Sequence, residues 1–490
     1  MNYVHAKVLA ASLLLTAASG GQAIELAREQ GERLQLPSSI DNSLPNERQG
    51  PRVLSPEPRK PATPGRPFEE QGRGLADHGI SPKLDMTQIY LRNPSTGLDT
   101  GNHESLTLFG IGADFDMQKL AGIDGGVVHF QQLYVPWTSN IAYGGQVGGV
   151  TVGKPAPYIP KVSHLTLFTY EQRLLEDRLT LEAGKSNAGN YFALPMCNLP
   201  FGCVSPAILQ DTAGINPPPY ANWGLRGAYD FSPRWRAQLG AWRSNNAYPF
   251  TNGWERREGD SGGTLSTAYL ANLAYRTDFS ISTYPTSFEL MGFYNNRRQK
   301  DPYYTVDGTS RATSQAEAAT HDGVRGFYLG AKQTFWRLDG GRAGERNPTA
   351  LSVHGSLSHV FEDTTETGVR NQGDLGLILS GPFRSRPFDS YSVKASWAQL
   401  TDRQQGFLEE THAVSSGGGD YRPGRDEYAI SLDANFVLND SIVLSPFVTR
   451  TFGASSWLNP RTGENPRDGY AFGVLLHVQL DQLLGLSGLR

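Results

Sequence analysis

Glycine-rich spacings and short catalytic patterns are the features of this 490-residue chain that could carry enzymatic chemistry. Gly148–Lys154 has the spacing of a phosphate-binding loop, but Pro155 stands where that loop needs Ser or Thr. Gly110-Ile111-Gly112 lacks the third glycine of a dinucleotide-binding fingerprint. The patterns Gly-x-Ser-x-Gly and His-Glu-x-x-His do not occur. We therefore predict that the chain is not an enzyme and uses no cofactor.

The cysteines and histidines are the side chains that could bind a metal. Cys197 and Cys203 enclose five residues, and an exported chain meets an oxidising compartment, so we predict a disulfide between them. A metal site is the alternative, but two thiols without a nearby pair of histidines are poor evidence for zinc. Four histidines in strand-like segments are scattered without metal-ligand spacing: His129, His354, His359 and His477. We predict no metal.

The first 81 residues indicate export and a flexible extension. Residues 1–23 contain one lysine, Lys7, an apolar run of about 11 residues and small residues before Ile24, which is typical of a cleaved signal peptide and too short for a membrane anchor. Residues 24–81 contain eight prolines between Pro37 and Pro67 and almost no aromatic residue. Such a segment buries too little apolar surface to fold alone. We predict a disordered, proline-rich periplasmic extension, with a specific docking arm as the alternative.

Alternation of apolar and polar residues dominates the chain beyond residue 82. Tyr428, Ile430 and Leu432, for example, alternate with polar or small side chains, and the apolar faces often carry Tyr or Trp near their ends. A soluble β-sandwich would bury such faces against a second sheet. A transmembrane barrel would turn them to lipid and place the aromatic residues at the two membrane interfaces.

About sixteen segments show this pattern, which favours a barrel. Every second connection between them is short, whereas the others mostly run from about 10 to about 35 residues, as in barrels with short periplasmic turns and long outer loops. We predict an all-β, transmembrane antiparallel β-barrel of about sixteen strands over residues 82–480, followed by a tail over 481–490. The predicted strands are 83–92, 103–117, 125–136, 163–173, 179–185, 221–231, 235–244, 266–278, 286–296, 325–337, 349–360, 374–382, 390–400, 427–438, 441–450 and 469–480.

Several segments resemble the OprB-like carbohydrate-selective porins. They are residues 170–193, the Cys197 and Cys203 pair, Trp223-Gly224-Leu225-Arg226, Gln238-Leu239-Gly240-Ala241-Trp242 and residues 112–122. The resemblance covers roughly residues 82–480 and implies a sixteen-stranded outer-membrane channel that passes sugars by diffusion. The chain departs from the usual barrel terminus, because it continues past Leu480 without a terminal aromatic residue.

A sugar channel needs hydrogen-bonding groups of both charge signs and aromatic surface in its lumen. Strand parity turns Asp114 and Asp230 inward together with the residues that we predict to line the channel: Glu182, Arg226, Arg236, Trp242, Tyr328, Lys332, Lys394, Glu427 and Asp433. The alternative is that these residues are the solvated inner wall of any barrel. The proline-rich connection from Ser186 to Tyr220 could fold inward as the constriction, or be an ordinary surface loop.

The predicted partners follow from charge and architecture. With 44 basic and 48 acidic residues the net charge is −4, which excludes the positive field that gathers nucleic acid. We predict a porin of the Gram-negative outer membrane that passes small carbohydrates such as glucose and contacts membrane lipid and lipopolysaccharide, as a homotrimer or as a monomer. A general or sugar-acid channel of the same fold, and an exported polysaccharide-acting β-protein, are the alternatives.

Overall fold

The computed structural model describes residues 65–197, 206–217, 220–245, 251–254, 265–341, 348–417 and 421–487. The predicted signal peptide, residues 24–64 of the predicted extension and Cys203 therefore lie outside the described residues. Cys197 is disulfide-bonded.

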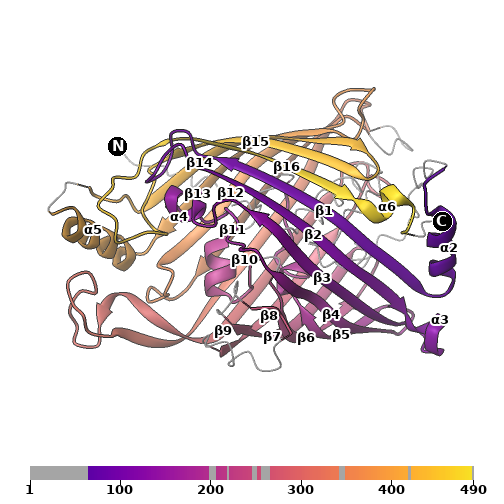
Figure 1. Cartoon of the computed structure of the whole chain (residues 1–490), viewed down its shortest axis with the longest axis horizontal. Helices are drawn as coiled ribbons and strands as arrows, with labels where there is room; N and C mark the ends of the chain where they lie inside the picture. The colour runs from indigo at the N-terminus through magenta and orange to yellow at the C-terminus, as the bar shows by residue number, and fades with distance from the viewer. Residues whose placement is uncertain are drawn as a thin grey trace.

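Sixteen antiparallel strands form one closed barrel, in which each strand pairs with its sequence neighbours and β1 pairs with β16 (Figure 1). The predicted architecture and strand number are confirmed. The strands are β1 (Ile80–Arg92), β2 (His103–Asp116), β3 (Gly126–Thr138), β4 (Ser163–Leu174), β5 (Leu179–Ser186), β6 (Asn222–Asp230), β7 (Trp235–Asn245), β8 (Leu265–Arg276), β9 (Thr286–Thr305), β10 (Ala318–Arg337), β11 (Ala350–Val360), β12 (Val369–Ser380), β13 (Ser390–Leu400), β14 (Asp426–Asn439), β15 (Ile442–Phe452) and β16 (Gly469–Gln479).

β9 and β10 are the strands that differ most from the prediction. Each has 20 residues, so their hairpin is longer than the expected ranges 286–296 and 325–337. The added residues contain charged side chains such as Arg298 and Lys300, which interrupt an apolar alternation but still pair in the sheet, with Asp322 and Thr320. The hairpin projects from the barrel at the same end as helix α5 (Asp402–Ser416) (Figure 1).

The alternation in sequence produces two chemically different faces. On β14 the side chains of Tyr428, Ile430 and Leu432 are 37%, 46% and 54% exposed, whereas Ser431 and Asp433 are buried on the other face. Exposed aromatic residues also occur near strand ends. The outer face is therefore apolar, as contact with lipid requires, and the inner face is polar.

Helices and helical turns lie in the connections between strands and in the segments before β1 and after β16. They are α2 (Glu69–Asp77), α3 (Met117–Ala121), α4 (Tyr143–Val147), the 3₁₀ turn η2 (Ala188–Asn190), the π turn η3 (Ala207–Thr212), α5 and α6 (Leu480–Leu484). The helices α2, α3 and α6 lie at the end with the short turns, and α5 lies at the end with the long loops (Figure 1). We call these the short-turn end and the long-loop end. No helix among the described residues is long and apolar enough to cross a membrane.

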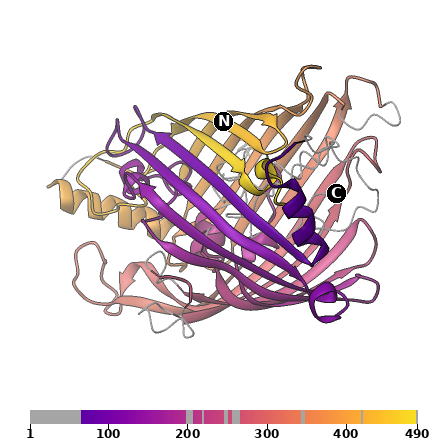
Figure 2. The same cartoon turned by 45° about the vertical axis from the view of Figure 1, so that its right-hand side comes forward.

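The two ends of the described chain meet at the short-turn end (Figure 2). The backbone amide of Phe68 donates to the carbonyl oxygen of Leu484 at 2.9 Å. The Arg66 guanidinium donates to the carbonyl of Gln482 and pairs with Asp440. The last part of the predicted extension is thus helix α2 packed on the tail, and the barrel itself begins at Ile80, two residues before the predicted boundary.

Candidate channel and constriction site

All nine residues predicted to line the channel lie on the inner side of the barrel wall and are buried. Their exposed fractions range from 0% for Tyr328 to 7% for Asp433. They do not form a single site. Glu182, Arg226 and Arg236 lie on β5 to β7, whereas Lys332, Lys394 and Asp433 lie on β10 to β14.

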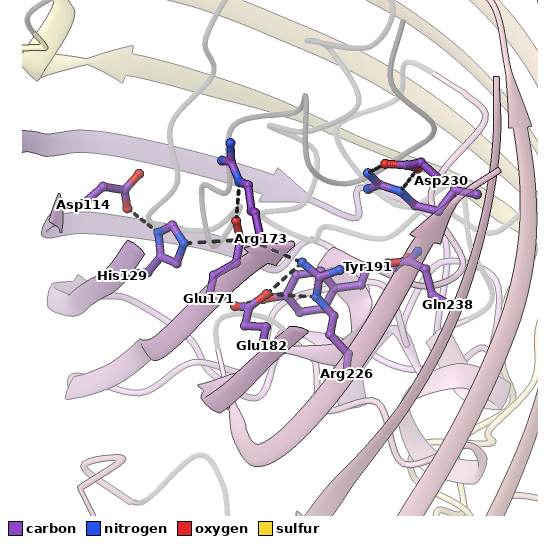
Figure 3. Close-up of polar contacts among 10 residues, drawn as sticks. Asp114, His129, Glu171, Arg173, Glu182, Tyr191, Arg226, Asp230 and Gln238 are labelled. Carbon is purple, nitrogen blue, oxygen red and sulfur yellow. Dashed lines mark hydrogen bonds and ion pairs between the residues drawn. The ribbon is translucent and has the colours of Figure 1, made fainter. Parts of the chain in front are cut away.

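Arg226 on β6 is the centre of the first polar group (Figure 3). Its Nε donates to Glu182 Oε2 at 2.9 Å, and its Nη1 donates to Gln238 Oε1 at 3.0 Å. Its guanidinium also lies 4.0 Å from the ring centre of Tyr191. A buried ion pair is stable only when hydrogen bonds satisfy its remaining polar atoms. Here Glu182 on β5 and Gln238 on β7 accept hydrogen bonds from the guanidinium, and Tyr191, which lies outside the strands, donates one to Glu182.

The polar group continues across the inner wall toward β1. Glu171 Oε2 lies 3.7 Å from Arg226 Nη2 and 4.0 Å from His129 Nε2. His129 Nδ1 lies 2.6 Å from Asp114 Oδ1, and Lys83 Nζ lies 2.6 Å from Asp114 Oδ2. The register pairs Asp114 with His129, Glu171 with Glu182, and Glu182 with Arg226. Figure 3 shows the resulting line of charged side chains from Asp114 to Arg226, and Lys83 extends it through Asp114. We call Lys83, Asp114, His129, Glu171, Glu182 and Arg226 the charged track.

Tyr191, which lies in the connection between β5 and β6, holds the Glu182 carboxylate of the charged track in place. Its hydroxyl donates to Glu182 Oε1 at 2.9 Å. Burial, together with the negative charge of Glu182, raises the pKa of Tyr191 well above its usual value. The hydroxyl therefore stays protonated and remains a donor to the carboxylate.

Asp230 and Arg236 form a separate ion pair beside the short turn between β6 and β7. Arg236 Nε and Nη2 donate to the two carboxylate oxygens of Asp230, each at 2.7 Å. This two-pronged geometry is the strongest form of an arginine–carboxylate contact.

The described parts of the connection between β5 and β6, residues 187–197, 206–217 and 220–221, fold into the barrel. We call this connection the β5–β6 loop. The backbone amides of Ala193 and Leu194 donate to the two carboxylate oxygens of Glu289 on β9, each at 2.8 Å. The hydroxyl of Tyr328 on β10 donates to the carbonyl oxygen of Leu194 at 3.0 Å. The inner wall thus holds this loop across the lumen.

Aromatic packing and a second set of hydrogen bonds complete the attachment of this loop. Trp242, which is 1% exposed, stacks on Tyr191 with ring centres 6.1 Å apart and meets Phe192 edge-on. Trp242 and Tyr328 therefore lie where the loop contacts the wall, and not on open lumen surface. Farther along the loop, the Thr212 carbonyl accepts from Asn295 Nδ2 at 3.0 Å, and its hydroxyl lies 2.9 Å from that of Thr367.

A second inward-folded segment, the β3–β4 loop over residues 139–162, was not anticipated. Glu427 on β14 accepts hydrogen bonds from the backbone amides of Val150, at 3.1 Å, and Thr151, at 2.7 Å. A Cβ at Gly149 would lie 2.6 Å from Glu427 Oε1, so a larger residue there would displace the carboxylate from this position. The spacing of Gly148–Lys154 thus serves an internal carboxylate in place of a phosphate.

The two loops meet inside the barrel. Lys154 Nζ of the β3–β4 loop lies 2.6 Å from Asp211 Oδ2 of the β5–β6 loop. On its other side, the β3–β4 loop packs Tyr143 and Val147 into an apolar cluster with Leu106 and Leu133 on β2 and β3. The apolar core of this protein therefore lies inside the barrel, between the wall and the loops.

Lys332, Lys394 and Asp433 belong to a second polar patch on β10 to β14. The register pairs Lys332 with His354, and Asp433 accepts a hydrogen bond from its register partner Ser392. Within the described residues, possible metal-ligand atoms of Cys197, His354 and Asp374 lie within 4.8 Å of one another. Because the sulfur of Cys197 is in a disulfide, it supplies no thiolate to a metal.

Comparison with known proteins identifies the family. The sequence profile of the carbohydrate-selective porins called OprB matches residues 103–479. The chain belongs to the OprB family. Porin B of Pseudomonas aeruginosa is 22% identical over 395 residues, which cover 76% of this chain and 82% of that protein. A high-pH structure of Pseudomonas putida OprB has the same fold, with a TM-score of 0.69 and 19% identity over 83% of this chain and 95% of that chain.

Membership of the OprB family confirms the predicted class of function. The protein is a sugar-selective porin of the Gram-negative outer membrane; it is a channel and not an enzyme. Its solutes are sugars.

Several polar residues of this OprB-family porin were missed by the sequence reasoning. Glu171 and Glu289 alternate with outward-facing neighbours, so strand parity could have placed both on the inner face. Gln238 could have been found in the same way. Tyr191 carried no such signal, because it lies in a loop whose path depends on contacts with the wall.

Proposed function

We propose that this porin conducts neutral, monosaccharide-sized sugars such as glucose past a constriction formed by the β5–β6 loop and the charged track. The observation that carries this proposal is the arrangement of Arg226, Glu182, Gln238 and Tyr191 at the inner surface of that loop. These four side chains are buried and bonded to one another, and Gln238 also donates to the carbonyl oxygen of Tyr191 at 2.9 Å, so they hold the β5–β6 loop against the wall and set the width of the passage. We propose that the nine predicted residues either form the polar wall of this passage or, like Trp242 and Tyr328, support the loop that narrows it.

The charge balance of the wall favours a neutral solute over the sugar-acid alternative. Three cations, Lys83, Arg173 and Arg226, face three carboxylates on the track. The second patch likewise combines Lys332 and Lys394 with Asp374 and Asp433. A channel for anions would require an excess of positive charge to offset the cost of removing the anion from water.

Current through planar bilayers tests the proposal. The purified protein should give steady conductance that glucose reduces at lower concentration than a sugar acid of the same size does, because the wall offers no excess positive charge. A silent bilayer at high protein concentration would reject the channel assignment. Stronger reduction by the sugar acid would reject the neutral solute in favour of the anion channel.

We further propose the surroundings of the barrel. Membrane lipid and, in the outer leaflet, lipopolysaccharide would contact the exposed apolar face, whose Leu225 and Leu239 side chains are 61% and 67% exposed. Residues 1–23 would be removed on export, and residues 24–64 would lie in the periplasm, which the position of α2 at the short-turn end supports. We also propose that the protein assembles as a homotrimer. Its mass in detergent should then equal that of three chains, and a mass of one chain would contradict the proposal.

A further inference from the structure

A cavity of about 340 Å³ lies at the junction of the two inward-folded loops, apart from the charged track. Its lining comes from the β3–β4 loop, the β5–β6 loop and the connection between β15 and β16, all of which start at the long-loop end. It falls within the usual range for small-molecule sites, about 300–1,000 Å³. The residues that define its chemistry are Lys154, Tyr158, Gln210, Pro217, Tyr220 and Leu458.

The lining combines apolar ring surface with hydrogen-bonding groups. The Tyr158 side chain is 48% exposed, so part of its ring is open to a solute. Lys154 carries a charge that Asp211 neutralises at 2.6 Å, and both side chains keep some exposure, 14% and 23%. Gln210 adds an amide that both donates and accepts.

This combination fits one class of ligand. A free anion would lose much of its attraction to Lys154, because Asp211 already compensates that cation. A purely apolar solute would leave the ion pair and the Gln210 amide poorly hydrated. A neutral saccharide has apolar ring faces for Tyr158 and hydroxyl groups for the polar atoms, so it matches both parts of the lining.

We propose that this cavity is a saccharide-binding site at the entrance of the channel, which captures the sugar before it reaches the constriction. The site rests on the proposed function, because it supplies the same neutral solute. Its position where the loops are joined by Lys154 and Asp211 puts it beside the route into the lumen. Pro155 and Pro157 form part of the β3–β4 side, and their fixed φ angles restrict the backbone of the cavity wall.

The test is sugar block of single channels with glucose added to one side of the bilayer at a time. Tyr158→Ala should raise the half-blocking concentration from one side by roughly threefold to tenfold, the worth of one aromatic contact, and leave block from the other side unchanged. Tyr158→Phe keeps the ring and should stay within roughly twofold of the wild type. Tyr284→Ala is the matched control, because that side chain is 39% exposed between β8 and β9 at the short-turn end.

The outcomes separate the two proposals. Suppose that glucose blocks the wild type, and that from each side it blocks Tyr158→Ala at the same concentration as the wild type. The entrance site is then wrong, and the channel function stands. If glucose fails to block the wild type at all, the proposed function itself is wrong. The melting temperature of Tyr158→Ala in detergent, followed by circular dichroism, shows whether the variant barrel has folded, independently of its conductance.

Discussion

At the scale of the residue, the buried charges described above are compensated by an ion-pair partner, as for Arg226, or by backbone hydrogen-bond donors, as for Glu289 and Glu427. Arg226 is 2% exposed and contacts Glu182 at 2.7 Å through Nη2. Removal of one member of a buried ion pair leaves the other without compensation, which costs about 3–5 kcal/mol. The same contacts hold Tyr191, and with it the β5–β6 loop, in place beside the passage.

Arg226→Ala should therefore weaken sugar block strongly. The substitution removes the bonds to Glu182 and Gln238, which in turn hold Tyr191 of the β5–β6 loop. Hydrogen bonds to a charged group are worth about 1.5–3 kcal/mol, so we expect the constriction to loosen and the half-blocking glucose concentration to rise roughly tenfold or more. The cation preference of the pore should also rise, because Glu171 and Glu182 lose their counter-charge. Tyr428→Ala, on the outer face of β14, is the control. Equal effects of the two substitutions on block would contradict the inward assignment of Arg226.

At the scale of the element, wall carboxylates hold the two inward-folded loops. Glu289 receives the amides of Ala193 and Leu194, and Glu427 receives those of Val150 and Thr151. Each carboxylate acts as a cap for backbone donors that the lumen would otherwise leave without a protein partner. The position of each loop therefore depends on a few charge-assisted bonds in addition to apolar packing.

Glu289→Gln should loosen the β5–β6 loop. The amide presents one oxygen and one NH₂ group to two backbone donors, so one amide loses its acceptor at a cost of about 1.5–3 kcal/mol. Single-channel recording should show a larger and noisier conductance. Leu290→Ala, on the outer face of the same strand and 46% exposed in the wild type, should leave the current as it is. A quiet, unchanged current in Glu289→Gln would show that this carboxylate does not hold the loop.

The sequence predicted the strands better than the loops, and the reason is the range of the interactions. Alternation in Tyr428, Ile430 and Leu432 is a local property that the membrane and the lumen impose on every strand. The loop contacts join residues far apart in sequence: 96 positions separate Ala193 from Glu289, and 276 separate Thr151 from Glu427. Strand parity correctly predicted that Trp242 faces the inside of the barrel. That Tyr191 and Phe192 cover it there depends on the path of the β5–β6 loop.

At the scale of the whole molecule, the barrel closes where β1 pairs with β16, and the two chain ends meet beside this closure. Gly72 of α2 lies so close to the Gly485 carbonyl oxygen that a Cβ would overlap it. Lys119 Nζ in α3 donates to the Ala76 carbonyl at 2.6 Å and secures the other end of α2. These contacts tie the segments before β1 and after β16 to the rim of the barrel.

Gly72→Ala should lower the thermal stability of the barrel. The added methyl group forces α2 away from the tail, and such overpacking typically costs about 1–3 kcal/mol. Gly74→Ala is a matched control in the same helix, because a Cβ there meets no atom within 4 Å. It should be neutral or stabilise by up to about 1 kcal/mol through helix propensity. Melting followed by circular dichroism in detergent gives both values, and equal melting temperatures would rule out a tight contact between α2 and the tail.

We propose that the charge-balanced wall makes this porin selective for neutral sugars. Swelling of liposomes tests this selectivity most directly. Liposomes that contain the protein should swell faster in glucose than in a sugar acid of the same size, and much faster than in a large oligosaccharide. Equal or faster swelling in the sugar acid would contradict the claim, because it would show that the wall favours anions.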